Sequence, residues 1–243
     1  MRGKFITVEG GEGVGKTTNI TFIQKQLSHN GVQVVLTREP GGTDVAEKIR
    51  DLLLAHHDEE LDPTAELLLV FAARAQHIKR VIEPALARGN WVLCDRFTDA
   101  TYAYQGGGRG LNIKHIAQLE ALVQDKLQPD VTILLDIEPK IGLERASQRA
   151  ELDRFEVEPS EFFDKVRKSY LDRAQQQPER FRLVDASQSL QNVQRQLADI
   201  LNTVLAHKPK VFRTQKCKSR RCVWSQSTPI LARIAKVSVN DQL

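Results

Sequence analysis

A glycine-rich loop at residues 10–18, with the sequence GGEGVGKTT, has the residue types of a phosphate-binding site. Its spacing matches G-x-x-x-x-G-K-[ST], here between an expected strand and an expected helix. The glycines let successive backbone N–H groups point at an anion, and the helix start adds the positive end of its dipole. Lys16 supplies a charge for the β- and γ-phosphates, and Thr17 a hydroxyl for Mg²⁺. The sequence therefore predicts a nucleotide site formed by Gly10, Gly11, Glu12, Gly13, Val14, Gly15, Lys16, Thr17 and Thr18.

Glu12 places a carboxylate inside this loop, where it cannot face phosphate oxygens without repulsion. We expect it to contact a hydroxyl or an arginine on the far side of the site. An arginine that neutralises transition-state charge must then come from elsewhere, because the loop has no second base. The segment ERASQRAELDRFE offers three candidates, Arg145, Arg149 and Arg154. A solvated amphipathic helix explains this charge run equally well, so spacing alone leaves both readings open.

Charged residues also follow two other expected strands. Asp95 ends the apolar run WVLCD, where a carboxylate can hold Mg²⁺ or its water, or can cap a loop. Arg96 comes next and is placed to form bidentate hydrogen bonds with a second phosphate. Arg38 lies in TREPGGT, where Pro40 and two glycines fix the backbone course. We expect Arg38 to meet a phosphate, the alternative being an ordinary surface arginine.

Two further segments suit recognition of a planar base. In LLLVFAARAQH, Phe71 and Arg74 share one face of an expected helix, although periodicity alone favours the core for Phe71. A ring can stack on a base while the guanidinium reads an edge carbonyl. The segment TYAYQGGGRG is expected to be a glycine-rich bend or a flexible loop, which brings Thr101, Tyr102 and Gln105 near the same strand end.

The elements that would position these residues alternate as a parallel α/β sheet requires. Strands are expected at 4–10, 32–37, 91–95, 131–136 and 181–186. Helices are expected near 15–29, 43–56, 64–88, 113–127, 139–150, 160–177 and 190–205. Ligands of such sheets gather at the carboxyl ends of the strands, where the charged segments lie. The fold class is therefore α/β, a five-stranded parallel sheet flanked by helices.

The distribution of charge argues against a nucleic-acid-binding surface on the body of the chain. Residues 208–243 contain nine Lys and Arg and one Asp, a net charge of +8 in a chain whose total is +4. The first 207 residues therefore carry −4, and the basic character belongs to the extension. No Asn-Lys-x-Asp segment of the kind that reads guanine occurs, which disfavours a GTP-binding switch.

The cysteines and the apolar runs indicate a cytoplasmic setting. Cys94 lies in an apolar run and is expected to be a buried thiol, while Cys217 and Cys222 lack the spacing of a zinc site. A reducing compartment fits this pattern best. No apolar run approaches membrane-spanning length, and MRGKFITVEG leads into a strand rather than a cleavable signal.

The motifs GGEGVGKTT, TREPGGT, FAAR, DRF and YQGGGRG, in this order, resemble those of the thymidylate kinase (dTMP kinase) family. The resemblance extends over about residues 3–205. It implies the three-layer phosphate-loop fold of nucleoside monophosphate kinases, usually as a homodimer. It also implies that the γ-phosphate of ATP is transferred to dTMP with Mg²⁺, in dTTP synthesis.

The resemblance also assigns roles to single residues. It implies that Phe71 stacks on thymine, that Arg74 bonds the base, and that Glu12 reaches the sugar 3′-hydroxyl. Bacterial members of this type carry a catalytic arginine in a mobile lid, here about residues 142–156 with Arg149 at that position. The expected catalytic residues are Lys16, Arg38, Asp95 and Arg149, and the expected metal contacts are Thr17 and Asp95. The expected substrate contacts are Glu12, Arg38, Phe71, Arg74, Arg96, Thr101, Tyr102 and Gln105.

Two features depart from the family pattern. Phe97 stands where Tyr or His is usual, so a polar contact of that tip is lost. Residues 208–243 have no counterpart, and a disordered arm, a partner-binding segment and read-through sequence are the readings open for them. We expect a disordered basic extension to a domain of residues 1–207. Two alternatives remain: a phosphate-loop kinase with a different substrate, and a nucleic-acid-binding protein that binds through the basic extension.

Overall fold

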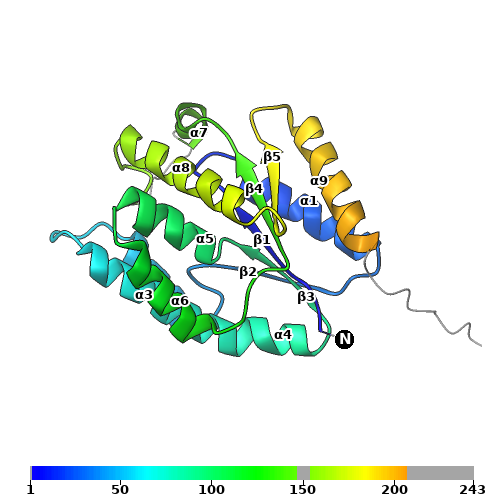
Figure 1. Ribbon diagram of the computed structural model, residues 1–243, viewed down its shortest axis with the longest axis horizontal. Helices are drawn as coiled ribbons and strands as arrows, with labels where there is room; N and C mark the ends of the chain where they lie inside the picture. Colours follow the sequence, from blue (N-terminus) through cyan, green and yellow to red (C-terminus); the bar gives the residue numbers. More distant parts are fainter. Residues whose placement is uncertain (1, 147–153, 207–243) are drawn as a thin grey trace, which may run out of the picture. The chain divides into compact units, whose positions relative to one another are not determined.

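The computed structural model describes residues 2–146 and 154–206, in which five strands form one parallel sheet (Figure 1). The strands are β1 (Phe5–Glu9), β2 (Val34–Arg38), β3 (Trp91–Asp95), β4 (Val131–Asp136) and β5 (Phe181–Asp185). Their spatial order is β2-β3-β1-β4-β5, so the strand that leads into the phosphate loop lies at the centre. The five predicted strands and their parallel arrangement are thereby confirmed, with ends that shift by two residues or fewer.

Helices cover both faces of this sheet (Figure 1). The α-helices are α1 (Lys16–His29), α2 (Asp44–Leu54), α3 (Pro63–His77), α4 (Glu83–Ala87), α5 (Thr98–Thr101), α6 (Ile113–Gln124), α7 (Pro139–Ala146), α8 (Ser160–Gln176) and α9 (Leu190–Ala206). Two π-helical segments are η1 (Ile78–Ile82) and η2 (Tyr102–Gly108). Apolar residues of α1 and α9 pack on one face of the sheet, and those of η1, α4 and α8 on the other. The result is a three-layer α/β fold.

The sequence determines where α2 and α3 begin. Thr43 accepts a hydrogen bond from the backbone N–H of Ala46 and so caps α2. Asp62 accepts from Thr64 and Ala65 at the start of α3, and Pro63 takes the first helical position. Such caps satisfy amide groups that have no partner inside the helix. They hold α3, which carries Arg74, at a defined start.

Two predicted elements differ from those observed. The helix expected at 64–88 is a helical run in which the π-turn η1 separates α3 from α4. The bend expected at 101–110 is wrong, because α5 and η2 make residues 98–108 helical. The glycines of η2 serve close packing: a Cβ on Gly107 would lie 2.8 Å from the carbonyl oxygen of Lys165, and one on Gly108 would lie 2.4 Å from the Phe162 ring. Glycine therefore lets η2 approach α8.

The carboxyl ends of the strands bring the charged segments together, as predicted. Arg38 at the end of β2 pairs in register with Asp95 at the end of β3, which also pairs with Val8 of β1. Part of the predicted lid (142–156), including Arg149, lies outside the described residues, as does the extension 208–243. Within the described ranges, no helix is both long and apolar enough to span a bilayer.

Candidate active site

A cavity of about 590 Å³ lies at the carboxyl edge of the sheet. It is bounded by the phosphate loop (residues 10–18), the ends of β2 and β3, and helices α2, α3 and η2. Thirteen of the predicted site residues line it: Glu12, Gly13, Val14, Gly15, Lys16, Thr17, Thr18, Arg38, Arg74, Asp95, Arg96, Thr101 and Gln105. Loop residues 12–18 and the predicted phosphate-binding arginines therefore face one space, whereas Gly10 and Gly11 line a second cavity.

Lys16 is held against the loop that carries it. Its Nζ donates to the carbonyl oxygens of Gly10 and Gly11, at 3.3 and 2.9 Å. Burial lowers the pKa of Lys16, and repulsion from Arg96 lowers it further, while nearby carboxylates such as Glu12 oppose the shift. Gly13 brings the loop close to α7, since a Cβ there would lie 1.9 Å from the carbonyl oxygen of Gly142. The loop is thus backed directly by the helix that leads into the predicted lid.

The residues at the predicted metal position fit a Mg²⁺ ion. Asp95 and Thr17 both line the cavity. Asp95 Oδ1 is buried and has no hydrogen-bond partner within residues 2–146 and 154–206. A buried carboxylate oxygen without a partner is costly unless a ligand satisfies it. Carboxylate and hydroxyl oxygens are ligands that Mg²⁺ prefers.

Glu12 bonds an arginine, as its position in the loop predicts. Its Oε1 accepts from Arg96 Nη2 at 2.6 Å and from the Tyr104 hydroxyl at 2.7 Å. The guanidinium carbon of Arg96 also lies 4.6 Å from the centre of the Tyr104 ring. Arg96 has a φ of 67°, unusual for a residue with a side chain. This backbone turn aims a charged side chain into the cavity.

Arg74 is fixed on all sides but one. Its Nε donates to Glu39 at 2.6 Å and its Nη2 to the Thr101 hydroxyl at 2.9 Å. The guanidinium carbon lies 4.8 Å from the ring centre of Phe71 and 5.1 Å from that of Phe97. The remaining nitrogen, Nη1, is buried and finds no hydrogen-bond partner in the described part of the chain. A single donor is left for a ligand.

Two predicted substrate contacts do not line the cavity. Phe71 is buried among Leu67, Tyr102 and Ile116, where it supports Arg74. The Tyr102 hydroxyl donates to Glu120 at 2.6 Å, and the tyrosine ring lies against Arg173 of α8. Tyr102 therefore points away from the predicted site.

Sequence reasoning missed several residues that line the cavity. Tyr104 lies three residues after Thr101, so the helical course of 98–108 turns Thr101, Tyr104 and Gln105 to the same side. A helix assigned to this segment would have favoured Tyr104 over Tyr102. Glu39, Arg50 and Phe155 also line the cavity, and no spacing in the sequence indicates this.

Arg154 and Arg109 meet on a buried carboxylate. Arg154 donates to Glu66 Oε2 at 2.6 Å and to the carbonyl oxygen of Leu53 at 3.0 Å. Arg109 lies 3.3 Å from the same oxygen of Glu66 and 2.5 Å from Glu158. Glu66 also accepts from Gln105 at 2.8 Å. Of the three predicted lid arginines, Arg154 is thus bound to α3, while Arg145 donates to the carbonyl oxygen of Ala186.

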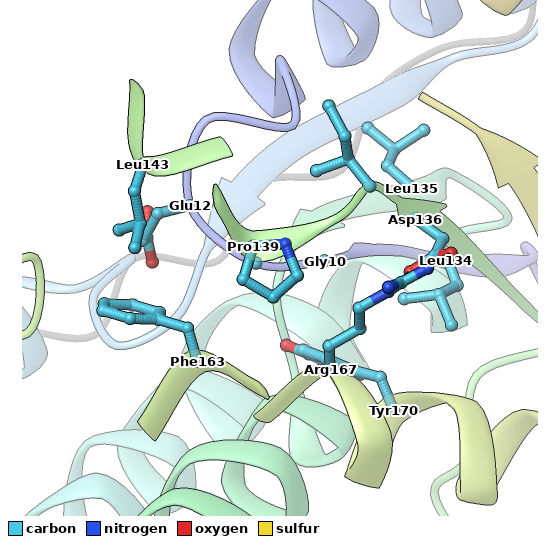
Figure 2. Close-up of a pocket in the computed structure, with 12 residues that line it drawn as sticks. Gly10, Glu12, Leu134, Leu135, Asp136, Pro139, Leu143, Phe163, Arg167 and Tyr170 are labelled. Atoms are coloured by element: carbon cyan, nitrogen blue, oxygen red, sulfur yellow. Dashed lines mark hydrogen bonds and ion pairs between the residues drawn. The ribbon is translucent and has the colours of Figure 1, made fainter. Parts of the chain in front are cut away.

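A second, smaller cavity of about 20 Å³ lies behind the phosphate loop (Figure 2). Figure 2 shows Pro139 and Leu143 of α7, and Phe163 and Tyr170 of α8, around the loop residues that include Gly10. Arg167 forms a two-point ion pair with Asp136 at the end of β4. The volume suits about one water molecule, so this cavity is too small for a nucleotide.

The arrangement as a whole suits phosphoryl transfer between two anions. Lys16 and the neighbouring loop residues line this cavity together with two further cations, Arg38 and Arg96. Positioning and charge neutralisation supply most of the catalysis in such a reaction, and little covalent chemistry by the protein is needed.

Comparisons with known proteins agree with this geometry. A family model described as thymidylate kinase matches residues 8–197. The thymidylate kinase of Pseudomonas syringae pv. tomato is 60% identical over 205 residues, which cover 84% of this chain and 98% of that protein. The thymidylate kinase of Teredinibacter turnerae is 57% identical over 205 residues, covering 84% of this chain and 100% of the relative. The crystal structure of thymidylate kinase from Ehrlichia chaffeensis superimposes with a TM-score of 0.68 at 32% identity, covering 84% and 100% of the two chains. Because the family model matches most of the chain and these relatives are similar over nearly their whole length, the chain belongs to the thymidylate kinase family.

Proposed function

We propose that the central cavity holds dTMP beside the γ-phosphate of ATP. Some of the residues described above bind the acceptor, and others bind the donor. The chain phosphorylates dTMP to dTDP with ATP as donor and Mg²⁺ as cofactor, in the synthesis of dTTP. One observation carries the proposed placement of the substrates. Arg74 offers a single free donor to the same cavity that Lys16, Arg38 and Arg96 line with positive charge.

On the acceptor side, Arg74 Nη1 donates to a carbonyl of thymine. Arg38 and Arg96 neutralise the phosphate of dTMP, a role supported by their position on the cavity wall. Glu12 orients Arg96 and accepts from the 3′-hydroxyl of the sugar. Gln105 and Thr101 complete the wall beside the base. Phe71 supports the guanidinium of Arg74 from behind.

On the donor side, the amides of the phosphate loop and Lys16 bind the β- and γ-phosphates. Asp95 and Thr17 are the residues that would hold Mg²⁺, either directly or through its waters. When bound, the ion adds positive charge at the phosphate oxygens. Arg149, in the predicted lid (142–156), supplies the charge that stabilises the transferring phosphoryl group.

A coupled assay of ADP release across dTMP, dUMP, dCMP, AMP and thymidine tests the proposed acceptor. We expect dTMP to give the highest kcat/KM, and a higher value for another acceptor would overturn the assignment of the base site. Arg74→Ala should weaken dTMP use far more than ATP use. An unpaired carbonyl in a dry pocket costs about 1–3 kcal/mol, or roughly 5- to 150-fold. Equal losses for ATP and dTMP would remove Arg74 from the acceptor site.

We further propose that the enzyme acts as a cytoplasmic homodimer built from a kinase domain of residues 1–207. The buried, unpaired thiol of Cys94 supports a reducing compartment. Large apolar side chains are exposed on three neighbouring helices, α2, α3 and α6, which supports self-association: Val45, Leu52, Leu68, Ile113 and Leu122. Light scattering coupled to size exclusion tests the dimer, and Leu68→Glu should shift it toward monomer.

A further inference from the structure

The residue that fixes Arg74 is itself fixed by a buried chain of side chains. Glu39 accepts from Arg74 Nε with Oε2 at 2.6 Å, and its other oxygen, Oε1, lies 2.9 Å from His77 Nδ1. A carboxylate only accepts, so His77 Nδ1 carries the proton in this contact. On the other side of the ring, His77 Nε2 lies 2.6 Å from the Thr37 hydroxyl. Thr37 of β2 therefore contacts His77 of α3, His77 contacts Glu39, and Glu39 contacts Arg74, which lines the cavity.

The contacts of Glu39 with Arg74 and His77 are buried, and the contact of His77 with Thr37 is partly buried. Arg74, His77 and Glu39 are each less than 5% exposed. The His77 ring also lies against Gly42, where a Cβ would be 2.5 Å from ring carbon Cδ2. This tight fit leaves the ring little room to turn. In such a buried network each member restricts the orientation of the next.

The network acts on the orientation of the Arg74 guanidinium. Two edges of the Arg74 guanidinium are occupied by Glu39 and Thr101, and its faces lie near the rings of Phe71 and Phe97. The direction of Nη1 is then set by how Glu39 is held. Without Glu39 the guanidinium could rotate away from the base site.

We propose that Glu39, His77 and Thr37 are positioning residues that aim Arg74 Nη1 at the acceptor base, and so determine selectivity for a base with a carbonyl at that position. This inference rests on the proposed function, in which Arg74 reads thymine. Thymine and cytosine share the C2 carbonyl and differ at C4, where thymine has a carbonyl and cytosine an amino group that cannot accept from a guanidinium. In this inference, Nη1 is therefore directed toward C4. An aimed donor therefore favours dTMP over dCMP, and a donor that is free to rotate favours it less.

Glu39→Gln tests this inference, because glutamine keeps the size of the side chain but loses its charge. We expect the KM for dTMP to rise about tenfold, as the loss of a charge-assisted hydrogen bond implies. The ratio of kcat/KM for dTMP to that for dCMP should fall by a similar factor. The KM for ATP should change by less than about twofold, because Glu39 acts only on the acceptor side. Glu83→Gln, on the exposed ion pair with Lys79, is the matched control and should alter neither value.

A double-mutant cycle separates positioning from general damage. If Glu39 acts through Arg74, Glu39→Gln should raise the KM for dTMP in the wild-type background and leave it unchanged in the Arg74→Ala background. An equal rise in both backgrounds would overturn the inference, as would an unchanged KM in a folded Glu39→Gln protein. If Arg74→Ala itself left dTMP use intact, the proposed function of Arg74 would fail too.

Thr37 provides a milder test if Glu39→Gln does not fold. Thr37→Val keeps the shape and removes the hydroxyl that contacts His77. We expect a smaller rise in the KM for dTMP, about threefold, with a lower ratio of dTMP to dCMP use. Thr37→Ser keeps the hydroxyl and should restore both values. A ratio that Thr37→Val leaves unchanged would contradict the role of the network.

Discussion

Glu12 Oε1 lies 2.6 Å from Arg96 Nη2, which places a carboxylate of the phosphate loop in contact with a cation of the acceptor side. The pair joins the two halves of the cavity, since Glu12 lies four residues before Lys16 and Arg96 follows the end of β3. The carboxylate also holds the arginine in place. Burial lowers the pKa of Arg96, but the interactions with Tyr104, then Glu12, together with Tyr170 and Asp95, raise that pKa by more. The loop that we propose to bind one phosphate thus also orients the side chain proposed for the other.

Removing the charge of Glu12 should impair the acceptor more than the donor. Glu12→Gln leaves a partly buried Arg96 without its charged partner, and hydrogen bonds to charged groups contribute about 1.5–3 kcal/mol. We expect kcat/KM for dTMP to fall roughly 10- to 100-fold. Steady-state kinetics with each substrate varied in turn measure this.

Tyr104→Phe is the graded comparison, because it removes one hydrogen bond to Glu12 and leaves the ion pair with Arg96 in place. Its effect on dTMP use should be smaller than that of Glu12→Gln. An equal rise in the KM values for ATP and dTMP in Glu12→Gln would show that the residue supports the loop in general.

Glu9 should make the stability of the folded chain depend on pH. Burial and, after it, the charge of Asp99 raise its pKa from 4.5 to about 8, although Arg96 opposes the shift. Between these two pKa values the folded state binds more protons at Glu9 than the unfolded state does. The contribution of Glu9 therefore favours folding below pH 4.5 and is lost as the pH rises toward 8.

Glu9→Gln removes this dependence, because glutamine resembles the protonated acid and can keep the contacts with Phe97 N and the Tyr170 hydroxyl. The Tm of the variant minus that of the wild type should increase steadily from about pH 5 to about pH 8.5. Scanning fluorimetry at matched ionic strength measures it. A constant difference across this range would mean that Glu9 titrates normally.

The sequence predicted the sheet and the cationic residues of the site, because both leave local signals. Apolar runs that end in charged residues indicate parallel strands, and the phosphate loop is recognised by the fixed spacing of its glycines, lysine and threonine. The outcome for Tyr102 shows where such signals fail. The glycines of η2 suggested a bend, and the helical course of residues 98–108, which turns Tyr104 rather than Tyr102 to the cavity, was not predicted.

Contacts between distant residues explain the rest of what the sequence did not reveal. Glu39 and His77 are 38 residues apart, and Glu66 and Arg154 are 88 apart. No periodicity within one segment connects such pairs. Each is a buried charged or polar group, so its partner becomes evident only when the fold is known.

Arg149 and Arg154 should differ sharply when each is replaced by alanine. The guanidinium of Arg154 is bound to Glu66 and to the Leu53 carbonyl, so it is not available to the phosphates in this arrangement. Arg149→Ala should lower kcat by about 10²-fold or more, as loss of a transition-state charge contact implies, with little change in the KM for dTMP. Arg154→Ala should keep kcat within about fivefold of the wild type. Pre-steady-state kinetics measure the rate of phosphoryl transfer in both variants and show which arginine acts in that step. A severe loss in Arg154→Ala with a near-normal Arg149→Ala would reverse the assignment.

Residues 208–243 should be dispensable for catalysis. The family model ends its match at residue 197, and the Pseudomonas syringae and Teredinibacter turnerae relatives are matched almost end to end by 205 residues of this chain. Every residue given a role above precedes α9, whose apolar side Val193, Leu197 and Leu201 packs against α1 and the sheet. A chain that ends at His207 should therefore keep its kcat/KM for dTMP and its Tm. Its net charge should change from +4 to −4, so salt-sensitive retention on an anionic resin should be lost. A clear fall in either kcat/KM or Tm would mean that residues beyond 207 stabilise the kinase domain, because the truncation removes nothing else.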